Sequence, residues 1–563
     1  ITTRLVGSEM CIRDSYKTQE DLTEALVAAY DPLKWNAYNA YSSYELVSNI
    51  MSDDAETGGS TVSDQPQLQR VNDFTNWVTP TNLPEGLWGR SYEGVNRANI
   101  VIEKCPLLPE GTMSEELRDR YVAEAHFLRV FYYFQLWRFF GYIPYYETNL
   151  GLDDITTVPQ LQPDEVYAKL IEDLDNNVIG KLPKIVPANE KGRATNGAAI
   201  AMKARIVLYQ NDDTKMKEIA SQLKELITDP AYQYDLIPDY KVLFDDEYEW
   251  CKESVFEVNY TEIGNSNDWA GKANQGNSDI IMLGARGLKD PNNVYVEGWG
   301  FAPVTKALND AFLPNDPRKW TTIIDHEEFR AEGGTVSSDV NQYTGYSVRK
   351  YHPRAGYSST VGTEALNYKN NYRVIRFSDV LLMASEALLR SGGSVGEAQD
   401  YYARVVKRAM GDDYKVPAVS LDNIYKERRY EFAMEGIRYW DLVRTNQAKD
   451  FIKGWDDTKK YLDVSYNIKE CSYDEKAKEY IGILALYIEM QVENEEKKMK
   501  LGMELHGCFQ SNEVAETWEK EFRELLQING TAALYSVARG LVMSITGQSY
   551  TCLLYTSPSP RDA

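Results

Sequence analysis

Charged side chains between positions 427 and 441 have the residue types and the spacing that could do chemistry. They are Glu427, Arg428, Glu431, Glu435, Arg438 and Asp441, and most stand three or four residues apart. Two opposed carboxylates serve a glycoside hydrolase as acid and as base or nucleophile. An arginine within helical reach of a carboxylate instead favours the ionised form, which has no proton to donate. Structural ion pairs are therefore the favoured interpretation, and a helical glycoside hydrolase stays open as the alternative.

Aromatic side chains offer a second kind of chemistry, the stacking of rings on the apolar faces of sugars. The chain holds 40 tyrosines and 11 tryptophans, and most are expected in the core or at interfaces. Loops carry binding residues more often than helix stripes do, so we select loop aromatics as candidate ligand contacts: Trp77, Trp269, Tyr295 and Trp299. Asp54, in the acidic, glycine-rich loop 52–60, is a candidate polar contact. The alternatives are a tryptophan that anchors its own loop and a loop that is a solvated turn.

The overall charge narrows the range of ligands. The 563 residues carry a formal net charge of -24 and are 43% hydrophobic, which suits a globular chain. Phosphate groups would be repelled, which argues against nucleic acid and anionic lipid as partners. The chain has four histidines and its cysteines show no paired spacing, so we expect no metal site, no cofactor and no disulfide framework. A neutral polar ligand fits this composition best.

One long apolar helix must organise the elements that position these residues. Residues 111–140 are apolar on nearly every helical face after Tyr121, and Gly141 with Pro144 marks the exit. Such a helix has to be buried among other helices. Thr112 and Glu115 have the spacing of a capping box, so we expect the helix to start at Thr112.

Shorter helices recur in pairs separated by polar turns, at residues 192–212 with 216–227 and at residues 373–392 with 395–411. Recurring pairs are typical of TPR-like packing, although no strict repeat of about 34 residues can be aligned. Between residues 228 and 372 the helical periodicity fades, and a loop-rich stretch of that length is more often functional than accidental. The predicted fold class is mainly α, with TPR-like helix pairs and a loop-rich insertion that holds the ligand-binding region.

Four motifs stand at separate places along this helical part. They are AEAHFLRVFYYFQLWRFFGYIP at 123–144, GRATNGAAIAMKARIVLY at 192–209, RVIRFSDVLLMASEALLRSG at 373–392 and ERRYEFAMEGIRYWDLVR at 427–444. Together they resemble the SusD/RagB family, the surface nutrient-binding lipoproteins of Bacteroidetes. The resemblance covers about residues 16–455 and implies a scaffold of TPR-like helix pairs.

The resemblance also implies a function that is not enzymatic. It predicts capture of an oligosaccharide at the cell surface and delivery to a SusC-like TonB-dependent outer-membrane transporter. Some family members take up peptides or glycoproteins, so a peptide or glycoprotein ligand stays open. The family implies attachment to the outer membrane through an N-terminal lipid anchor. We find no signal peptide or lipobox in this sequence and interpret that as truncation.

The chain past residue 455 departs from the family pattern. Residues 456–551 predict a small α+β fragment, with strand-like runs on either side of Asn494 and helices broken at Asn529 and Gly530. Residues 464–549 are similar to part of a SecB-type export chaperone, which predicts a fusion of two unrelated pieces. Residues 1–15 and 552–563 resemble translations of a sequencing adapter read in opposite senses, so both ends are excluded from fold reasoning.

Overall fold

The computed structural model describes residues 16–38, 40–74, 82–150, 158–452 apart from 270, 271 and 273, 459–493, 498–511, and 515–537 apart from 532, 535 and 536. The chain divides into two compact units. The helical unit holds the chain up to Lys453 except for two short excursions, Asp73–Thr81 and Leu150–Val158. Those excursions and Gly454–Ala563 form the C-terminal unit.

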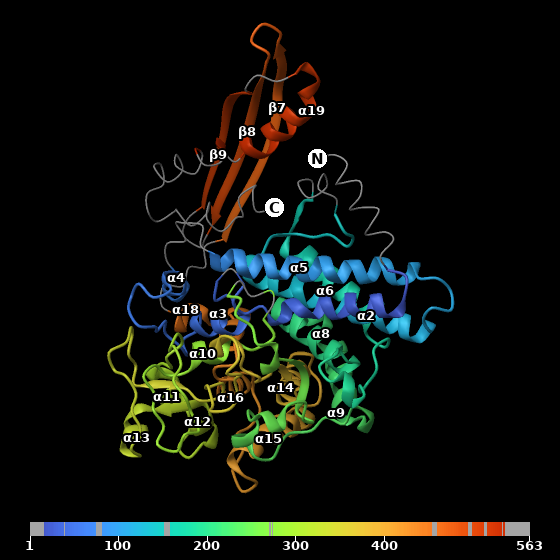
Figure 1. Ribbon diagram of the computed structural model, residues 1–563. Coiled ribbons are helices and arrows are strands. Elements are labelled where there is room, and N and C mark those ends of the chain that lie inside the picture. Colours follow the sequence, from blue (N-terminus) through green and yellow to red (C-terminus); the bar gives the residue numbers. More distant parts are fainter. Residues whose placement is uncertain are drawn as a thin grey trace. The chain divides into compact units, whose positions relative to one another are not determined.

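Helices make up most of the helical unit, and several that are neighbours in sequence pack as pairs. Helix α5 packs along α6, α8 against α9, and α14 against α15, while α2 lies beside α5 (Figure 1). The helix bounds are α2 Gln19–Tyr30, α3 Tyr44–Ile50, α4 Pro66–Asp73, α5 Asn82–Lys104, α6 Glu115–Phe140, α7 Pro163–Asp173, α8 Asn196–Gln210, α9 Met216–Thr228, α10 Asp279–Leu283, α11 Lys306–Ala311, α12 Pro317–Thr322, α13 His326–Ala331, α14 Phe377–Arg390, α15 Val395–Met410, α16 Leu421–Glu431, α17 Arg438–Arg444 and α18 Ala448–Phe451. The predicted mainly α class is confirmed.

The long apolar helix is α6, and it lies in the centre of the core. Every residue from Phe127 to Trp137 is buried, because apolar side chains cover all faces of this stretch. The predicted capping box at Thr112 is wrong. Thr112 belongs to a turn in which its N–H donates to the Pro109 carbonyl, and the N-cap is Ser114, whose hydroxyl accepts the Leu117 N–H at 3.2 Å.

One small sheet brings together two strands that enclose most of the predicted loop-rich region, residues 228–372. Strand β3, Ser254–Val258, pairs antiparallel with β6, Tyr372–Arg376, and this pair joins the main hydrophobic core. Between the two strands lie the short helices α10 to α13 and a hairpin of β4, Ile323–Asp325, with β5, Tyr346–Val348. A third small sheet pairs β1, Ile143–Pro144, with β2, Gln160–Leu161. The loops between 228 and 372 are therefore held from both ends by the helical core.

The C-terminal unit contains a three-stranded antiparallel sheet and a short helix. Its strands are β7 Lys459–Asp474, β8 Glu479–Glu493 and β9 Lys498–Gln510, in the order β7-β8-β9, and they are followed by α19, Glu519–Leu525. Tyr480 and Phe522 stack with ring centroids 5.4 Å apart, which attaches α19 to the sheet. The predicted small α+β fragment is confirmed, although the sequence interpretation missed β7. In the part of the chain that the structure describes, no helix has the length and apolar character needed to cross a membrane.

Candidate functional site

Two of the predicted aromatic residues lie against each other at the surface of the helical unit. The rings of Trp269 and Trp299 have centroids 5.6 Å apart and an interplanar angle of 23°. That separation is typical of offset stacking, which leaves part of each ring uncovered. Trp269 is 41% exposed, a high value for a tryptophan. Tyr41 tilts against Trp299 at 5.8 Å, and we call Tyr41, Trp269 and Trp299 the aromatic face.

Backbone hydrogen bonds to α10 fix the position of Trp299. Its N–H donates to the Ile281 carbonyl at 2.7 Å, and the Phe301 N–H donates to the Met282 carbonyl at 2.8 Å. Phe301 is 2% exposed, and its ring centroid lies 5.7 Å from that of Tyr41, so a buried ring packs against the aromatic face. The face thus rests on a short helix and a buried ring, not on a free loop.

Gly58 and Gly59, from the N-terminal part of the chain, form backbone hydrogen bonds with the same loop. The N–H of Gly59 donates to the Gly300 carbonyl at 2.9 Å, and the N–H of Gly58 donates to the Phe301 carbonyl at 3.2 Å. A Cβ atom on Gly58 would lie 1.7 Å from the Gly300 oxygen, so only glycine fits there. Chain segments more than 200 residues apart in sequence therefore build one surface.

Polar groups surround the aromatic face. Asp64 accepts hydrogen bonds from the Ser60 N–H and hydroxyl at 2.8 Å and lies 3.4 Å from the Arg286 guanidinium. Burial and the nearby Asp64 charge raise the pKa of Tyr41, so its hydroxyl stays protonated and can donate. Rings bordered by such donors and acceptors suit a ligand with apolar faces and many hydroxyls.

The other predicted contacts lie elsewhere. Tyr295 is half-buried and packs edge-on against His352 at 5.2 Å. Its ring has the guanidinium groups of Arg349 at 5.7 Å and Arg354 at 5.8 Å. Among the described residues, no ring contact joins Tyr295 to the aromatic face. Trp77 lies outside the described residues.

Asp54 does not present its carboxylate to solvent. It is 1% exposed, and its Oδ1 accepts from Arg429 Nε at 2.9 Å. Its backbone carbonyl accepts the Thr305 N–H at 3.0 Å. Asp54 therefore fastens the loop that supports Trp299 to helix α16, and we leave it out of the ligand contacts that we propose.

The charged residues between 427 and 441 form a buried network of ion pairs. Glu431 is 0% exposed and pairs with Arg376 at 2.7 Å, with Arg318 at 3.2 Å and with Arg408. Glu427 is 4% exposed, and although burial raises its pKa, its carboxylate is bound to Arg318. Burial and pairing with arginine leave neither carboxylate accessible to a sugar in the described structure.

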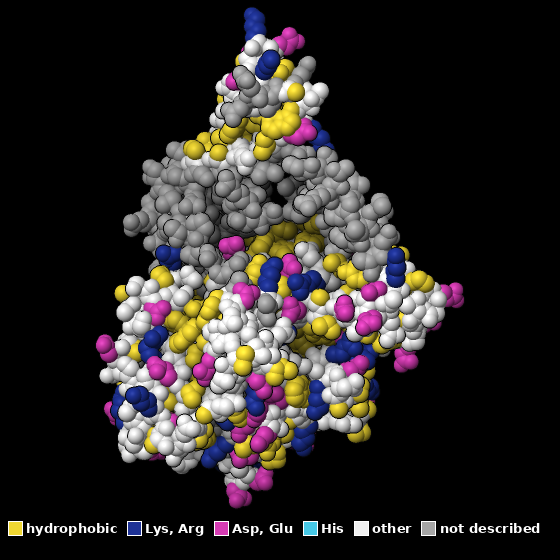
Figure 2. Space-filling view, viewed as in Figure 1, with side chains coloured by type: hydrophobic (Ala, Val, Ile, Leu, Met, Phe, Trp, Pro, Cys, Tyr) yellow, Lys and Arg dark blue, Asp and Glu magenta, His cyan; other side chains and the backbone are white. Residues whose placement is uncertain are grey.

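Two further observations bear on the ligand class. Acidic and basic side chains are interspersed over the face of the helical unit shown in Figure 2, with no broad basic area among its described residues. Within the same described part of the chain, no group of three or more His, Cys, Asp or Glu side chains is placed to hold a metal ion.

A helical scaffold that presents stacked tryptophans from its loops has the architecture of a binding protein, and comparison with known proteins gives its family. The model described as "SusD family" matches residues 252–484, and the model described as "Starch-binding associating with outer membrane" matches residues 8–208. SusD-like protein P2 of Formosa agariphila is 24% identical over 450 residues, which is 76% of this chain and 84% of that protein.

Solved structures agree with this result. One titled "Laminarin binding SusD-like protein" is 34% identical, with a TM-score of 0.72, and the match covers 78% of this chain and 95% of that one. Surface glycan-binding protein A from Bacteroides thetaiotaomicron, solved in complex with laminarihexaose, is 33% identical with a TM-score of 0.70, over 77% of this chain and 92% of that one. The chain belongs to the SusD family.

Proposed function

We propose that this protein is a cell-surface glycan-binding protein and that the aromatic face is its ligand site. The observation that carries the proposal is the exposed stack of Trp269 on Trp299. A sugar ring that stacks on an indole covers the ring with its C–H groups while its hydroxyls stay free for hydrogen bonds. Asp64, Arg286 and the Tyr41 hydroxyl lie at the edge of the face and can meet those hydroxyls.

A laminarin-type glucan is the first ligand to test. Two similar solved structures carry laminarin or laminarihexaose in their titles, and both are more than 30% identical to this chain. An alternative within the same scaffold is a peptide or glycoprotein ligand. The stacked indoles favour the glycan, because offset rings with an uncovered face suit the flat, apolar side of a sugar.

Binding here requires no chemical step. The carboxylates that might act as a glycosidase acid and base are buried in ion pairs with arginines. We therefore propose a protein without catalytic activity that holds its ligand through stacking and hydrogen bonds. Incubation with laminarin should release no reducing sugar, and measurable release would overturn this part of the proposal.

The proposed location and partner follow from the family. We propose that the protein lies on the outer membrane, is held there by an N-terminal lipid anchor, and delivers the glycan to a SusC-like TonB-dependent transporter. The description of one matching family model, which associates starch binding with the outer membrane, supports the location. Co-purification of the protein with a SusC-like transporter from outer membranes would support the proposed partner. Purification from such membranes without any transporter would count against that partner.

We also propose that residues 456–551 are a separate segment resembling a SecB-type export chaperone, and that residues 1–15 and 552–563 are adapter translations. The division of the chain at Lys453 supports a boundary near residue 455. The SusD family match runs on to residue 484, which counts against a sharp boundary there. Limited proteolysis of the full chain tests the point: a stable fragment ending near residue 455 is expected, and one that always retains the sheet β7-β8-β9 would contradict it.

The binding proposal is tested by affinity electrophoresis of the full chain in gels containing laminarin, starch or no polysaccharide. We expect retardation by laminarin that is lost in Trp269→Ala. The matched control is Trp320→Ala, because Trp320 is 49% exposed but is no part of the aromatic face. Removal of one stacking ring should cost about 1.5 kcal/mol of binding free energy, which corresponds to about a tenfold weaker affinity. Equal retardation of both variants would reject the aromatic face as the site.

A further inference from the structure

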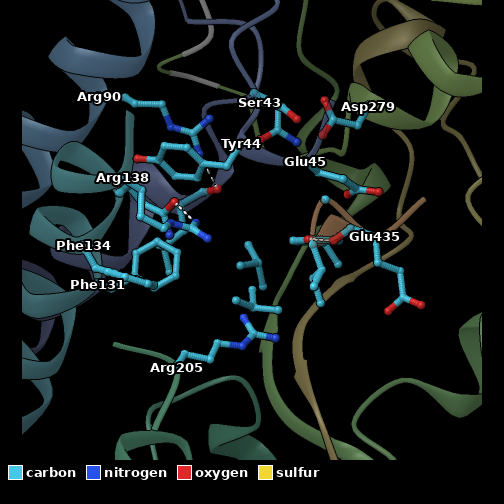
Figure 3. A pocket seen from close by; sticks show the side chains of 18 of the residues that line it. Ser43, Tyr44, Glu45, Arg90, Phe131, Phe134, Arg138, Arg205, Asp279 and Glu435 are labelled. Carbon is cyan, nitrogen blue, oxygen red and sulfur yellow. Dashed lines mark hydrogen bonds between the residues drawn. The ribbon is translucent and has the colours of Figure 1, made fainter. Parts of the chain in front are cut away.

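A polar cavity of about 50 Å³ lies inside the helical unit, next to the segments that carry the aromatic face (Figure 3). Its walls come from α3, α5, α6, α8 and α10. Figure 3 shows Glu45 and Asp279 on the side of Ser43, with Arg138 and Arg205 across the cavity. The space is enough for a few water molecules, and polar walls favour their presence.

Two carboxyl groups in this cavity lack the partners that buried acids normally have. Glu45 is 4% exposed and Asp279 is 3% exposed. Oε1 of Glu45 and Oδ1 of Asp279 have no hydrogen-bond partner within the described protein. Ser43 lines the same cavity, and its hydroxyl accepts the Leu46 N–H at 2.9 Å as the N-cap of α3. In the described parts of the chain neither acid has a salt bridge, whereas most other buried acids here are bound to arginine.

The nearby cations Arg90 and Lys350 make hydrogen bonds to other groups, although the Nε of Arg90 has no partner within the described protein. Arg90 donates to the backbone carbonyls of Leu33 at 3.1 Å and Ser42 at 3.2 Å, and Lys350 donates to Glu435 at 2.7 Å. The titratable and charged groups that face the pair from the surrounding elements are Arg90, Tyr260, Lys350, Tyr351, Tyr372 and Glu435, with Arg138 and Arg205 across the cavity. All three tyrosines have raised pKa values and stay neutral, so they add no charge.

Two neighbouring carboxylates that are both ionised would repel each other in this low-dielectric site. Burial first, and then the charges of Asp279 and Glu435, raise the pKa of Glu45 well above its ordinary value. Burial raises the pKa of Asp279 to about 7, against the effects of Ser43 and Arg90. Near neutral pH the pair therefore retains at least one proton.

The pair is connected to the aromatic face on both sides. Glu45 is in the first turn of α3, four residues after Tyr41. Asp279 is the first residue of α10, the helix whose carbonyls hold the backbone of Trp299 and Phe301. Ser43, the N-cap of α3, lines the same cavity as Asp279. A change of charge at the pair therefore acts where Tyr41 meets Trp299.

We propose that Glu45 and Asp279 are positioning residues for the aromatic face, which hold Tyr41 against Trp299 while at least one of them is protonated and loosen this contact when both ionise. The inference rests on the glycan-binding function proposed above. It makes ligand affinity dependent on pH through two groups that do not themselves touch the ligand. Mildly acidic and neutral conditions favour capture, and alkaline conditions weaken it.

The test is calorimetric titration of the full chain with laminarin from about pH 6 to about pH 8.5, a range that spans the ionisation of Asp279. We expect the wild-type affinity to fall by about fivefold or more, the lower end of ordinary coupling between sites. Asp279→Asn keeps the shape of the side chain but carries no titrating proton, so its affinity should vary little with pH. Glu45→Gln is the second variant if Asp279→Asn fails to fold.

Glu249→Gln is the matched control. Burial also raises the pKa of Glu249 to about 7, but its carboxylate accepts the Asn371 N–H at 2.7 Å and does not line the cavity. This variant should keep the wild-type loss of affinity at high pH. A flat wild-type profile, or a fall in Asp279→Asn equal to that of wild type, would overturn the proposal.

Hydrogen exchange separates failure of this inference from failure of the glycan proposal. The amides of Trp299, Gly300 and Phe301 donate to α10 and its end, so their protection reports the contact without any ligand. After correction for the intrinsic rates, exchange should rise with pH in wild type and stay level in Asp279→Asn. If laminarin never binds but exchange behaves in this way, the positioning role stands and the glycan does not. Affinity that rises with pH and is lost on adding a chelator would indicate that the two carboxylates bind a cation. That result would overturn the proposal that a protonated carboxyl group positions the aromatic face.

Discussion

Replacing Glu431 by Gln should strongly destabilise the helical unit. Glu431 is fully buried, and its carboxylate lies against Arg318, Arg376 and Arg408. An amide of the same shape cannot neutralise the guanidinium groups, and its own N–H groups would face other donors. Breaking a buried ion pair in this way costs about 3–5 kcal/mol. We expect a loss of about 4 kcal/mol, a large part of the roughly 5–15 kcal/mol by which proteins are stable.

Urea unfolding followed by far-UV circular dichroism measures this loss, because most helices belong to the helical unit. Asp310→Asn is the control. Asp310 pairs with Lys306 on the surface, where the two side chains are 53% and 73% exposed, so its loss should change the unfolding midpoint little. Unfolding midpoints that coincide for Glu431→Gln and Asp310→Asn would refute the role of the buried network.

The pH dependence of the same variant gives an independent check. Burial opposes ionisation, but Arg408, Arg376 and Arg318 outweigh it and lower the pKa of Glu431 below its ordinary 4.5. A lowered pKa in the folded state contributes stability above the unfolded value and loses it as the pH falls. The stability gap between wild type and Glu431→Gln should therefore be constant near neutral pH and narrow below about pH 4.5. A gap that widens in acid would contradict this sign.

Three further changes test other parts of the structure. Burial opposes ionisation of Asp379, but Arg205 and Arg428 outweigh it and lower its pKa from 3.8 to about 2. Asp379→Asn should therefore lose about 2 kcal/mol of the free energy of unfolding at neutral pH. Urea titrations at each pH should show this loss shrinking as the pH falls from about 4 towards 2. Gly58→Ala places a Cβ against the Gly300 oxygen. We expect a lower melting temperature, a loss of about 1–3 kcal/mol in the free energy of unfolding, and weaker laminarin binding. An unchanged melting temperature would contradict the close approach of the two segments. Phe127→Ala removes a fully buried ring from α6 and should cost about 3–5 kcal/mol, whereas Leu107→Ala, at a side chain 74% exposed, should change the melting temperature little.

Periodic segments of the sequence predicted the scaffold well, because the spacing of their apolar residues indicates which faces of a helix are buried. The apolar run of α6 and the helix pairs α8 with α9 and α14 with α15 all appear in the structure near their predicted places. Strand β7 was missed although Leu462, Val464 and other alternate residues of it are apolar. The N-cap of α6 was misplaced by two residues, because Ser114 and Thr112 are both capable caps and only the preceding turn decides between them.

The aromatic face could be predicted only in part. Trp269 and Trp299 were selected as loop aromatics, but no local pattern indicates that two residues thirty positions apart stack on each other. Tyr41 was missed because it stands in a tyrosine-rich run that suggested another helix. Asp54 looked solvent-exposed in its acidic loop, and only Arg429, 375 residues later in sequence, explains its burial. Long-range partners of this kind leave no trace in local spacing.

The central claim, that stacked indoles bind a glycan, is tested most directly by titrating laminarin into the full chain and into the double variant Trp269→Ala/Trp299→Ala. Circular dichroism and melting curves should first show that the double variant is folded. The structure predicts saturable binding by wild type and by Trp320→Ala, and loss of that binding in the double variant. Wild-type affinity retained in the folded double variant would contradict the assignment of the aromatic face as the glycan site.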